Sequence, residues 1–182
     1  MLIYACISGH GFGHGSRTAS VLAQLALRRP HWRLVVSSGL PTGFLDLAFG
    51  PVPFEHRRCS WDVGLVQADA LGGDPEATLD DLNHLDRRLP SQVDREATWL
   101  EARGDRLLVL GDVPAAAALV ARRLTVPLVW LASFGWDAIY RPMGGPFIRW
   151  ADRCRSLYGQ GDLLIRCPLS LPMDWALSLI HI

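Results

Sequence analysis

A chain of 182 residues, 49% of them hydrophobic, is long enough to form one sizeable domain with its own core. Its net charge is zero, so no overall field draws it toward nucleic acid or an anionic membrane surface, and we expect neither as a partner. All 18 basic residues are arginine, which excludes a P-loop and Schiff-base chemistry, because both require lysine.

The cysteines and the N-terminus indicate a cytoplasmic protein. The four cysteines show no CxxC spacing, and we expect them to be reduced and mostly buried. The N-terminus has no basic segment, and its first apolar run is too short for a signal peptide. No segment reaches the roughly 18 apolar residues of a membrane-spanning helix.

The first half of the chain alternates strand-like and helix-like patterns. Leu2–Ile7 is an apolar run typical of a buried strand. Ser16–Arg29 predicts a helix, because its apolar residues share one face and two arginines fall in its last turn. The patterns that follow are a strand at Trp32–Ser37, a short helix at Pro41–Phe49, a strand at Val52–Cys59 and a polar, irregular segment at Ser60–Asp74.

The second half continues this alternation after one long helical pattern. That pattern runs from Glu76 to Ala102, and we expect Pro90 to kink or split it. The remaining predicted elements are a strand at Arg106–Leu110, a helix at Pro114–Leu124, and strands at Pro127–Leu131 and Leu163–Arg166. The alternation predicts an α/β fold with a parallel sheet covered by helices on both faces, and such sheets bind ligands at the carboxyl ends of their strands.

The run from Ser8 to Arg17 follows the first predicted strand and carries the strongest functional signal. It holds two histidines, one arginine and four glycines, which are Gly9, Gly11, Gly13 and Gly15. Glycines allow backbone amides to approach a ligand, and a helix N-terminus behind them favours an anion such as phosphate. The alternative is a tight turn that only packs a strand against a helix; we favour ligand binding.

A dinucleotide fingerprint is the other interpretation of this run. It would also require an acidic residue at the end of the second strand to bind the ribose hydroxyls. That strand instead ends in Ser37 and Ser38, which argues against NAD, and we expect no cofactor.

Three side chains of the run are candidate functional groups. His14 is a candidate general base, because an imidazole near a helix start tends to stay neutral. His10 is as readily a ligand contact as a group that bonds the loop backbone. Arg17 is expected in the first helical turn, where a cation is unfavourable unless an anion binds; a solvated side chain is the equal alternative. Two histidines without cysteine partners do not make a metal site.

Further polar and aromatic candidates lie on later loops. Asp112 follows a predicted strand, and we expect it to cap the next helix, with a second role in the cleft possible in principle. Asp62, Gln67 and Asp69 lie on a glycine-containing loop that can bind sugar hydroxyls, although a solvated loop is the favoured interpretation. Trp136, beside Asp137, is a candidate for stacking on a sugar ring, with a core position as the alternative.

These motifs together resemble a known family. The run Ser8–Arg17 resembles the N-terminal loop of GT-B-type glycosyltransferases, and more narrowly the glycosyltransferase-like domain at the N-terminus of L-arabinokinases and related bacterial proteins. Three further motifs support the resemblance, at Asp62–Leu71, Gly111–Pro114 and Ser133–Tyr140. They occur in the order of the family and extend the resemblance over most of residues 1–175.

The resemblance implies a Rossmann-like, acceptor-side half of an enzyme that transfers a sugar from a nucleotide-sugar donor to a hydroxyl acceptor. His14 matches the last histidine of the family's glycine-rich loop, which makes it a candidate base or phosphate contact, and in the implied reaction it would be the base. The loop amides and Arg17 would hold a phosphate, and Asp69, Asp112 and Asp137 would orient hydroxyls. Because family members also adjoin sugar kinases, a non-catalytic sugar- or nucleotide-binding regulatory module is the second hypothesis. A nucleotide-dependent oxidoreductase is the third and is disfavoured.

The resemblance also predicts the domain organisation. Residues 1–175 would form the Rossmann-like domain, and the tail 176–182, which lacks a cap or stop signal, would be non-native or truncated. The C-terminal domain that binds the donor would be absent. We therefore expect the chain to be inactive by itself and to expose apolar surface where that domain docks.

Overall fold

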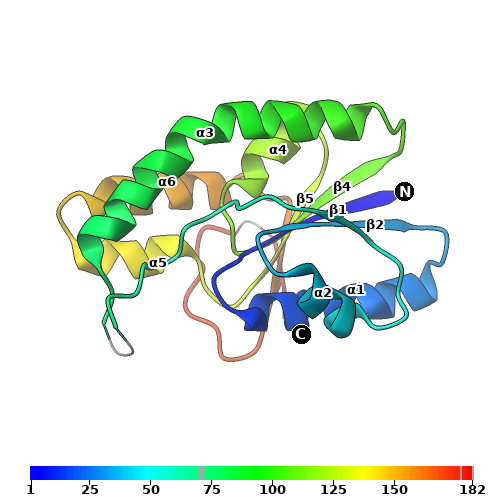
Figure 1. Ribbon diagram of the computed structural model, residues 1–182, viewed down its shortest axis with the longest axis horizontal. Coiled ribbons are helices and arrows are strands. Elements are labelled where there is room, and N and C mark those ends of the chain that lie inside the picture. The colour runs from blue at the N-terminus through cyan, green and yellow to red at the C-terminus, as the bar shows by residue number, and fades with distance from the viewer. Residues whose placement is uncertain (70–71, 177, 182) are drawn as a thin grey trace.

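The computed structural model describes residues 1–69, 72–176 and 178–181 and shows one parallel sheet between two layers of helices (Figure 1). Its seven strands lie in the order β3-β2-β1-β4-β5-β6-β7, and each pair of neighbours is parallel. The order reverses between β1 and β4, as it does in Rossmann-like sheets. The predicted α/β, Rossmann-like fold is confirmed.

The elements follow in chain order. The strands are β1 (Leu2–Ile7), β2 (Arg33–Ser38), β3 (Glu55–Arg57), β4 (Leu107–Asp112), β5 (Leu128–Ala132), β6 (Leu163–Arg166) and β7 (Leu179–His181). The helices are α1 (Phe12–Arg28), α2 (Thr42–Phe49), α3 (Pro75–Glu101), α4 (Ala117–Leu124), α5 (Trp136–Tyr140), the 3₁₀ helix η1 (Arg141–Met143) and α6 (Phe147–Tyr158).

Each face of the sheet has its own apolar core, because successive side chains of a strand point to opposite faces. Leu2, Tyr4 and Cys6 of β1 join the core beneath α3, α4 and the end of α6. Ile3 and Ile7, on the same strand, join the core beneath α1 and α2. Figure 1 shows α3 and α4 on one side of the sheet and α1 and α2 on the other.

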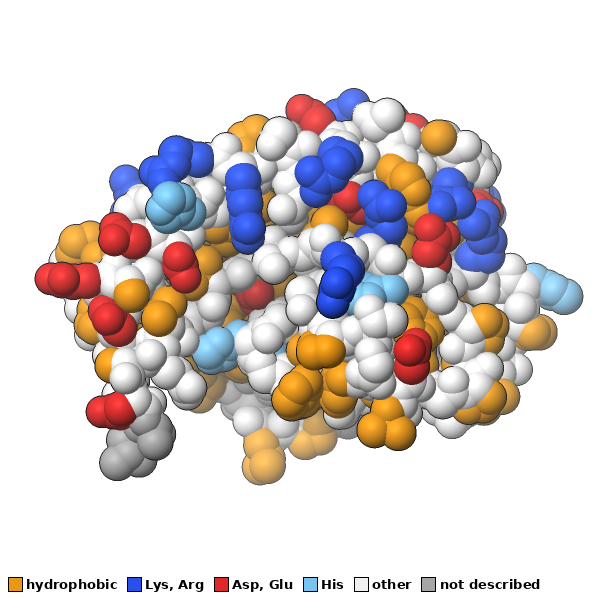
Figure 2. Space-filling model, in the orientation of Figure 1, with side chains coloured by type: hydrophobic (Ala, Val, Ile, Leu, Met, Phe, Trp, Pro, Cys, Tyr) orange, Lys and Arg blue, Asp and Glu red, His pale blue; other side chains and the backbone are white. Residues whose placement is uncertain are grey.

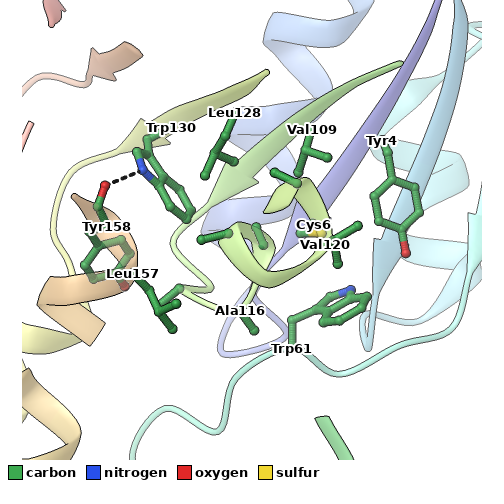
Figure 3. Close-up of a cluster of buried hydrophobic side chains, with 14 of the residues drawn as sticks. Tyr4, Cys6, Trp61, Val109, Ala116, Val120, Leu128, Trp130, Leu157 and Tyr158 are labelled. Atoms are coloured by element: carbon green, nitrogen blue, oxygen red, sulfur yellow. Dashed lines mark hydrogen bonds between the residues drawn. The ribbon is translucent and has the colours of Figure 1, made fainter. Parts of the chain in front are cut away.

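Aromatic side chains contribute much of the first of these cores, and some of their polar atoms are hydrogen-bonded (Figure 3). Trp130 of β5 donates a hydrogen bond from Nε1 to the carbonyl of Tyr158, at 2.9 Å. The Tyr158 hydroxyl donates to the carbonyl of Val113, at 2.6 Å. Three of the four cysteines are buried, which confirms the prediction of mostly buried thiols, and all four are free in the structure.

The structure departs from the predicted elements at several helices. α1 begins at Phe12 and not at Ser16, so two glycines of the motif lie inside the helix. α3 continues through Pro90, so it is not split there, but it changes direction near its middle (Figure 1), in agreement with the expected kink. The sequence analysis did not predict α5, η1, α6 or β7, although α6 buries Phe147, Trp150 and Ala151 at the spacing of an amphipathic helix.

The last described residues belong to the sheet. Leu179–His181, which the sequence analysis set apart from the domain, pairs with β6 as strand β7. Residues 177 and 182 of the predicted tail, and residues 70 and 71 at the end of the motif Asp62–Leu71, lie outside the described residues.

Charged side chains of both signs cover the surface. Figure 2 shows arginine side chains over the part of this face that α3 crosses, with acidic side chains among them. Many of them are paired, as in the ion pairs Arg103–Glu55 at 2.9 Å and Arg153–Asp86 at 2.5 Å. Of the helices that the structure describes, none has the length and apolar character needed to cross a membrane.

Candidate active site

The candidate site lies at the carboxyl edge of the sheet, where the strand order reverses between β1 and β4. The chain leaves β1 through Ser8–Gly11 and enters α1 at Phe12. Gly11 is the N-cap residue and has a φ of 96°, a conformation that favours glycine. The first turn of α1 therefore starts directly at the edge of the sheet, with no side chain capping its free amides.

The four glycines of the motif have different surroundings. A Cβ on Gly11 or Gly13 would meet nothing within 4 Å, so these two positions are open. A Cβ on Gly9 would make ordinary contact with Gly39, at 3.7 Å. A Cβ on Gly15 would lie 2.6 Å from the ring of Phe44, so Gly15 packs against α2. Gly15 therefore faces the helix layer, and its contribution to a ligand cradle stays a prediction.

His14, the third residue of α1, forms a hydrogen bond with Asp112 at the end of β4. The distance between His14 Nδ1 and Asp112 Oδ1 is 2.9 Å. Because the buried carboxylate is an acceptor, the ring nitrogen that faces it carries the hydrogen. Nε2 of the neutral ring is then an acceptor, which is the form that a general base requires. The His14 side chain is 12% exposed and Asp112 is fully buried.

Arg17 is in the second turn of α1, and its guanidinium faces protein groups. Its Nε donates to Asp112 Oδ2 at 3.1 Å, one terminal nitrogen donates to Asp112 Oδ1, and the other donates to Ser133 Oγ at 3.0 Å. Burial lowers the pKa of Arg17, but the hydrogen bond and charge of Asp112 outweigh burial and raise the pKa above its ordinary value. The expected position of Arg17 in the first turn is therefore wrong, and its counter-charge in the structure is Asp112.

Asp112 does not cap a helix. α4 begins at Ala117, its N-cap residue is Ala116, and no side chain caps it. The Asp112 carboxylate instead accepts hydrogen bonds from His14, Arg17 and the Thr18 hydroxyl. Its oxygens are thus occupied by the protein, which corrects the expectation that Asp112 orients ligand hydroxyls.

A second group of polar side chains surrounds His10. The His10 ring packs edge-on against Trp136, with 5.5 Å between ring centroids, and covers Gly64 so closely that a Cβ there would lie 2.4 Å from His10 Nδ1. Trp136 is only 3% exposed and donates from Nε1 to Asp62 Oδ2, at 2.9 Å. The core position predicted as the alternative for Trp136 is correct, and stacking on a sugar ring is not.

Asp62 is a site residue that the sequence analysis did not favour. Burial raises the pKa of Asp62, and hydrogen bonds from Ser8 and Trp136 and the charges of His14 and His10 oppose that rise. A mostly apolar cavity of about 40 Å³ lies behind Asp62 and Trp136, which is room for only one or two waters. The sequence did offer one reason to favour Asp62, which is that it is the first residue of the motif Asp62–Leu71.

The other predicted residues lie apart from the His14–Asp112 pair. Gln67 and Asp69 are exposed on a hairpin-like segment, where Gln67 forms a bridge with Gly73 and Asp69 accepts from the amide of Gly72 at 2.7 Å. Asp137 faces α6, with Oδ2 3.6 Å from Arg155, and burial raises its pKa. Neither group contacts His14 or Asp112 through a described hydrogen bond.

The end of β5 contributes two more groups, which lie in the motif Ser133–Tyr140 but received no individual role in the sequence analysis. Ser133, after β5, accepts from Arg17, and Phe134 packs edge-on against the His14 ring with 5.7 Å between centroids. The rule that located Asp112, a polar residue directly after a strand, also applies to Ser133. Within the described residues, no three His, Cys, Asp or Glu side chains gather as a metal site.

The strand order and the helices on both faces define the class of fold: the chain has the Rossmann-like fold found in GT-B glycosyltransferases. UGT89C1 of Arabidopsis thaliana, solved with UDP-L-rhamnose, is 12% identical with a TM-score of 0.58, over 91% of this chain and 44% of that chain. MurG of Acinetobacter baumannii is 13% identical with a TM-score of 0.51, over 99% and 45%. Phytolacca americana UGT2, solved with UDP-2fluoro-glucose and pterostilbene, is 15% identical with a TM-score of 0.56, over 91% and 47%.

Among curated proteins, the chain is similar to L-arabinokinase of Arabidopsis thaliana. The two are 29% identical over 140 residues, which is 74% of this chain and 13% of that protein. The resemblance predicted from the motifs is confirmed by this similarity. No protein-family model matches the chain. The chain spans less than half the length of each solved structure named above and about an eighth of the arabinokinase.

Proposed function

We propose that this chain is the acceptor-side half of a protein that transfers a sugar from a nucleotide-sugar donor to a hydroxyl acceptor. The hydrogen bond between His14 and Asp112 carries this proposal, because it orients an imidazole with a free acceptor nitrogen at the carboxyl edge of the sheet. Gly11 and Gly13, where a Cβ would meet nothing within 4 Å, lie in the turn just before His14, and the Gly11 amide donates to the carbonyl of Gly9 at 3.1 Å.

The proposed reaction uses His14 as the general base. Nε2 takes the proton from the acceptor hydroxyl while the oxygen forms a bond to the anomeric carbon of the donor. The bond from that carbon to the diphosphate oxygen breaks, and the nucleoside diphosphate leaves with the electron pair. Asp112 keeps the ring in the orientation and tautomer that this step requires.

The start of α1 supplies the proposed contact for the diphosphate. The first N–H groups of a helix lack partners within the helix, and the helix dipole adds partial positive charge there. Gly11 and Gly13 leave space for an oxyanion to approach these groups. The Arg17 guanidinium, which the sequence analysis assigned to phosphate, is engaged by Asp112, so we assign the phosphate to the amides.

We infer that a second domain completes the site. The relatives of known structure are more than twice as long as the matched region, and some of them were solved with UDP compounds. Phe12 at the start of α1 and Leu171, whose amide donates to the carbonyl of Ser133, expose apolar side chains near the carboxyl edge. Such side chains suit a domain contact, and we expect no turnover by the chain alone.

Two experiments test the proposal. In amide-detected NMR of this chain, UDP should shift the signals of Gly11 and Gly13 more than those of Gly43 and Gly50 in α2 and at its end. In a longer protein that joins this chain to the proposed second domain, His14→Ala should lower the transfer rate at least about a hundredfold. His31→Ala, at an exposed histidine, should leave the rate unchanged. A near-wild-type rate in His14→Ala would remove the proposed base.

A regulatory module of a sugar kinase is the second candidate function. The similarity to L-arabinokinase favours it. Such a module would bind the sugar or nucleotide at the same edge but would show no transfer in the longer protein and no rate loss in His14→Ala. An NAD-dependent oxidoreductase is disfavoured, because β2 ends in buried Ser37 and Ser38, where an acidic residue would bind ribose. Tight NAD binding would revive it.

A further inference from the structure

The His14–Asp112 pair has a third charged member. The Arg17 guanidinium contacts both carboxylate oxygens of Asp112, and one of its terminal nitrogens lies 3.3 Å from His14 Nδ1. Because His14 Nδ1 donates to Asp112, this short approach is a contact between two donors. It places a permanent positive charge directly beside the imidazole ring.

The third charge changes what the buried carboxylate does. In a histidine–aspartate pair without another charge, the carboxylate favours the imidazolium form. Here Asp112 is already neutralised by a guanidinium that binds both of its oxygens. Protonation of His14 would then place a second cation beside Arg17, in a site where Asp112 is fully buried and Arg17 is 23% exposed.

The charged and titratable groups near the ring come from several parts of the chain. They are Arg17 on α1 itself, Asp112 at the end of β4, Asp62 and His10 on the adjoining loops, and Cys167, which interacts with Arg17 and Asp112. Of these, Asp112 and Arg17 alone have described contacts to the His14 nitrogens, and Asp62 acts from farther away.

We propose that Arg17 is a positioning residue that keeps His14 neutral and fixes its tautomer with the hydrogen on Nδ1. Two contacts do this: the guanidinium holds Asp112 with Oδ1 toward His14, and its charge opposes the imidazolium form. The ring is thereby kept with Nε2 as an acceptor before any ligand binds. This inference rests on the proposed function only for the reason why a neutral His14 would be useful. The protonation state of the ring itself can be measured in the chain alone.

Nitrogen-15 NMR of the histidine rings tests the proposal without any substrate. It reports which ring nitrogen carries the hydrogen and the pH at the midpoint of the ring titration. In wild type we expect the hydrogen on His14 Nδ1. Arg17→Gln should raise the midpoint by about one to three pH units, the usual effect of a neighbouring charge. Arg17→Lys, which keeps the charge but loses the planar fork, should raise it less.

The outcomes separate a charge effect from a packing effect. Equal midpoints in wild type and Arg17→Gln would overturn the proposal, and so would a wild-type ring with its hydrogen on Nε2. Equal shifts in the Gln and Lys variants would assign the effect to lost geometry and would overturn the role of charge. A failed UDP test with these NMR results as expected would contradict the proposed function and leave this inference standing.

A second comparison covers the case in which Arg17→Gln does not fold, because that variant leaves Asp112 without its counter-charge. Asp112→Asn and the double variant Asp112→Asn/Arg17→Gln differ only in the guanidinium. The titration midpoint of His14 should be higher in the double variant than in Asp112→Asn, by an amount similar to the rise expected for Arg17→Gln alone. No difference between these two variants would overturn the proposal.

Discussion

Two glycines in the first turns of α1, Gly13 and Gly15, allow a matched test of the packing beside the site. An alanine Cβ at Gly13 meets nothing within 4 Å. At Gly15 it would lie 2.6 Å from Phe44 Cε1 and 2.7 Å from Leu40 Cδ1, and the Leu40 side chain is buried. Alanine favours a helix over glycine by about 1 kcal/mol at either position, so this gain cancels in the comparison.

The difference between Gly13→Ala and Gly15→Ala therefore isolates the cost of overpacking, which is about 1–3 kcal/mol. Urea denaturation of both variants and the wild type gives the unfolding free energies. We expect Gly13→Ala to be as stable as wild type or more stable, and Gly15→Ala to fall below it. Equal stability of the two variants would refute the packing of α1 against α2 through Gly15.

Three further predictions concern carboxylate side chains. Asp112→Asn removes the counter-charge of Arg17 and should lower the unfolding free energy by about 3 kcal/mol or more in urea denaturation; a loss below about 1 kcal/mol would contradict the pairing. Burial raises the pKa of Glu96, but hydrogen bonds from Arg57 outweigh burial and leave the pKa below its ordinary value. The folded-state pKa is thus lower than the unfolded one, so this stabilisation is present above the unfolded pKa and is lost as pH falls through the folded pKa. Wild type should therefore lose more stability than Glu96→Gln between about pH 7 and pH 3, and parallel losses would argue against it. Burial raises the pKa of Asp62, which makes its ionised form costly at neutral pH. Asp62→Asn keeps an acceptor for the indole and should unfold at the same or higher urea concentration; a marked loss of stability would show that the charge is needed.

Strands β1 to β6 were predictable because their apolar runs are short, β-rich and bounded by turn residues, whereas β7 was not predicted. Leu2–Ile7 and Leu163–Arg166 agree with the structure to the residue. The start of α1 was not predictable in the same way, because Gly13 and Gly15 are poor helix formers and the packing of Gly15 on α2 is a tertiary effect. α6 was missed although its apolar spacing was available in the sequence.

The site was predictable as a place but not as a set of contacts. The rule that polar groups after parallel strands meet at one edge brought His14 and Asp112 to the same region. It could not state that Asp112 faces His14 and Arg17 rather than the next helix, since these partners are 98 and 95 residues away in the chain. Gln67 and Asp137 follow similar patterns, and their side chains lie elsewhere.

The adjacency of β1 and β4 has a consequence for how this site comes into being. The two strands lie edge to edge in the finished sheet, yet about a hundred residues separate them, among them α1, β2, α2, β3 and α3. No fragment that ends before β4 can assemble the imidazole with its carboxylate. During synthesis the His14–Asp112 pair would form only after most of the domain has left the ribosome. A compound that recognises the assembled pair would in turn select for, and stabilise, the fully folded domain.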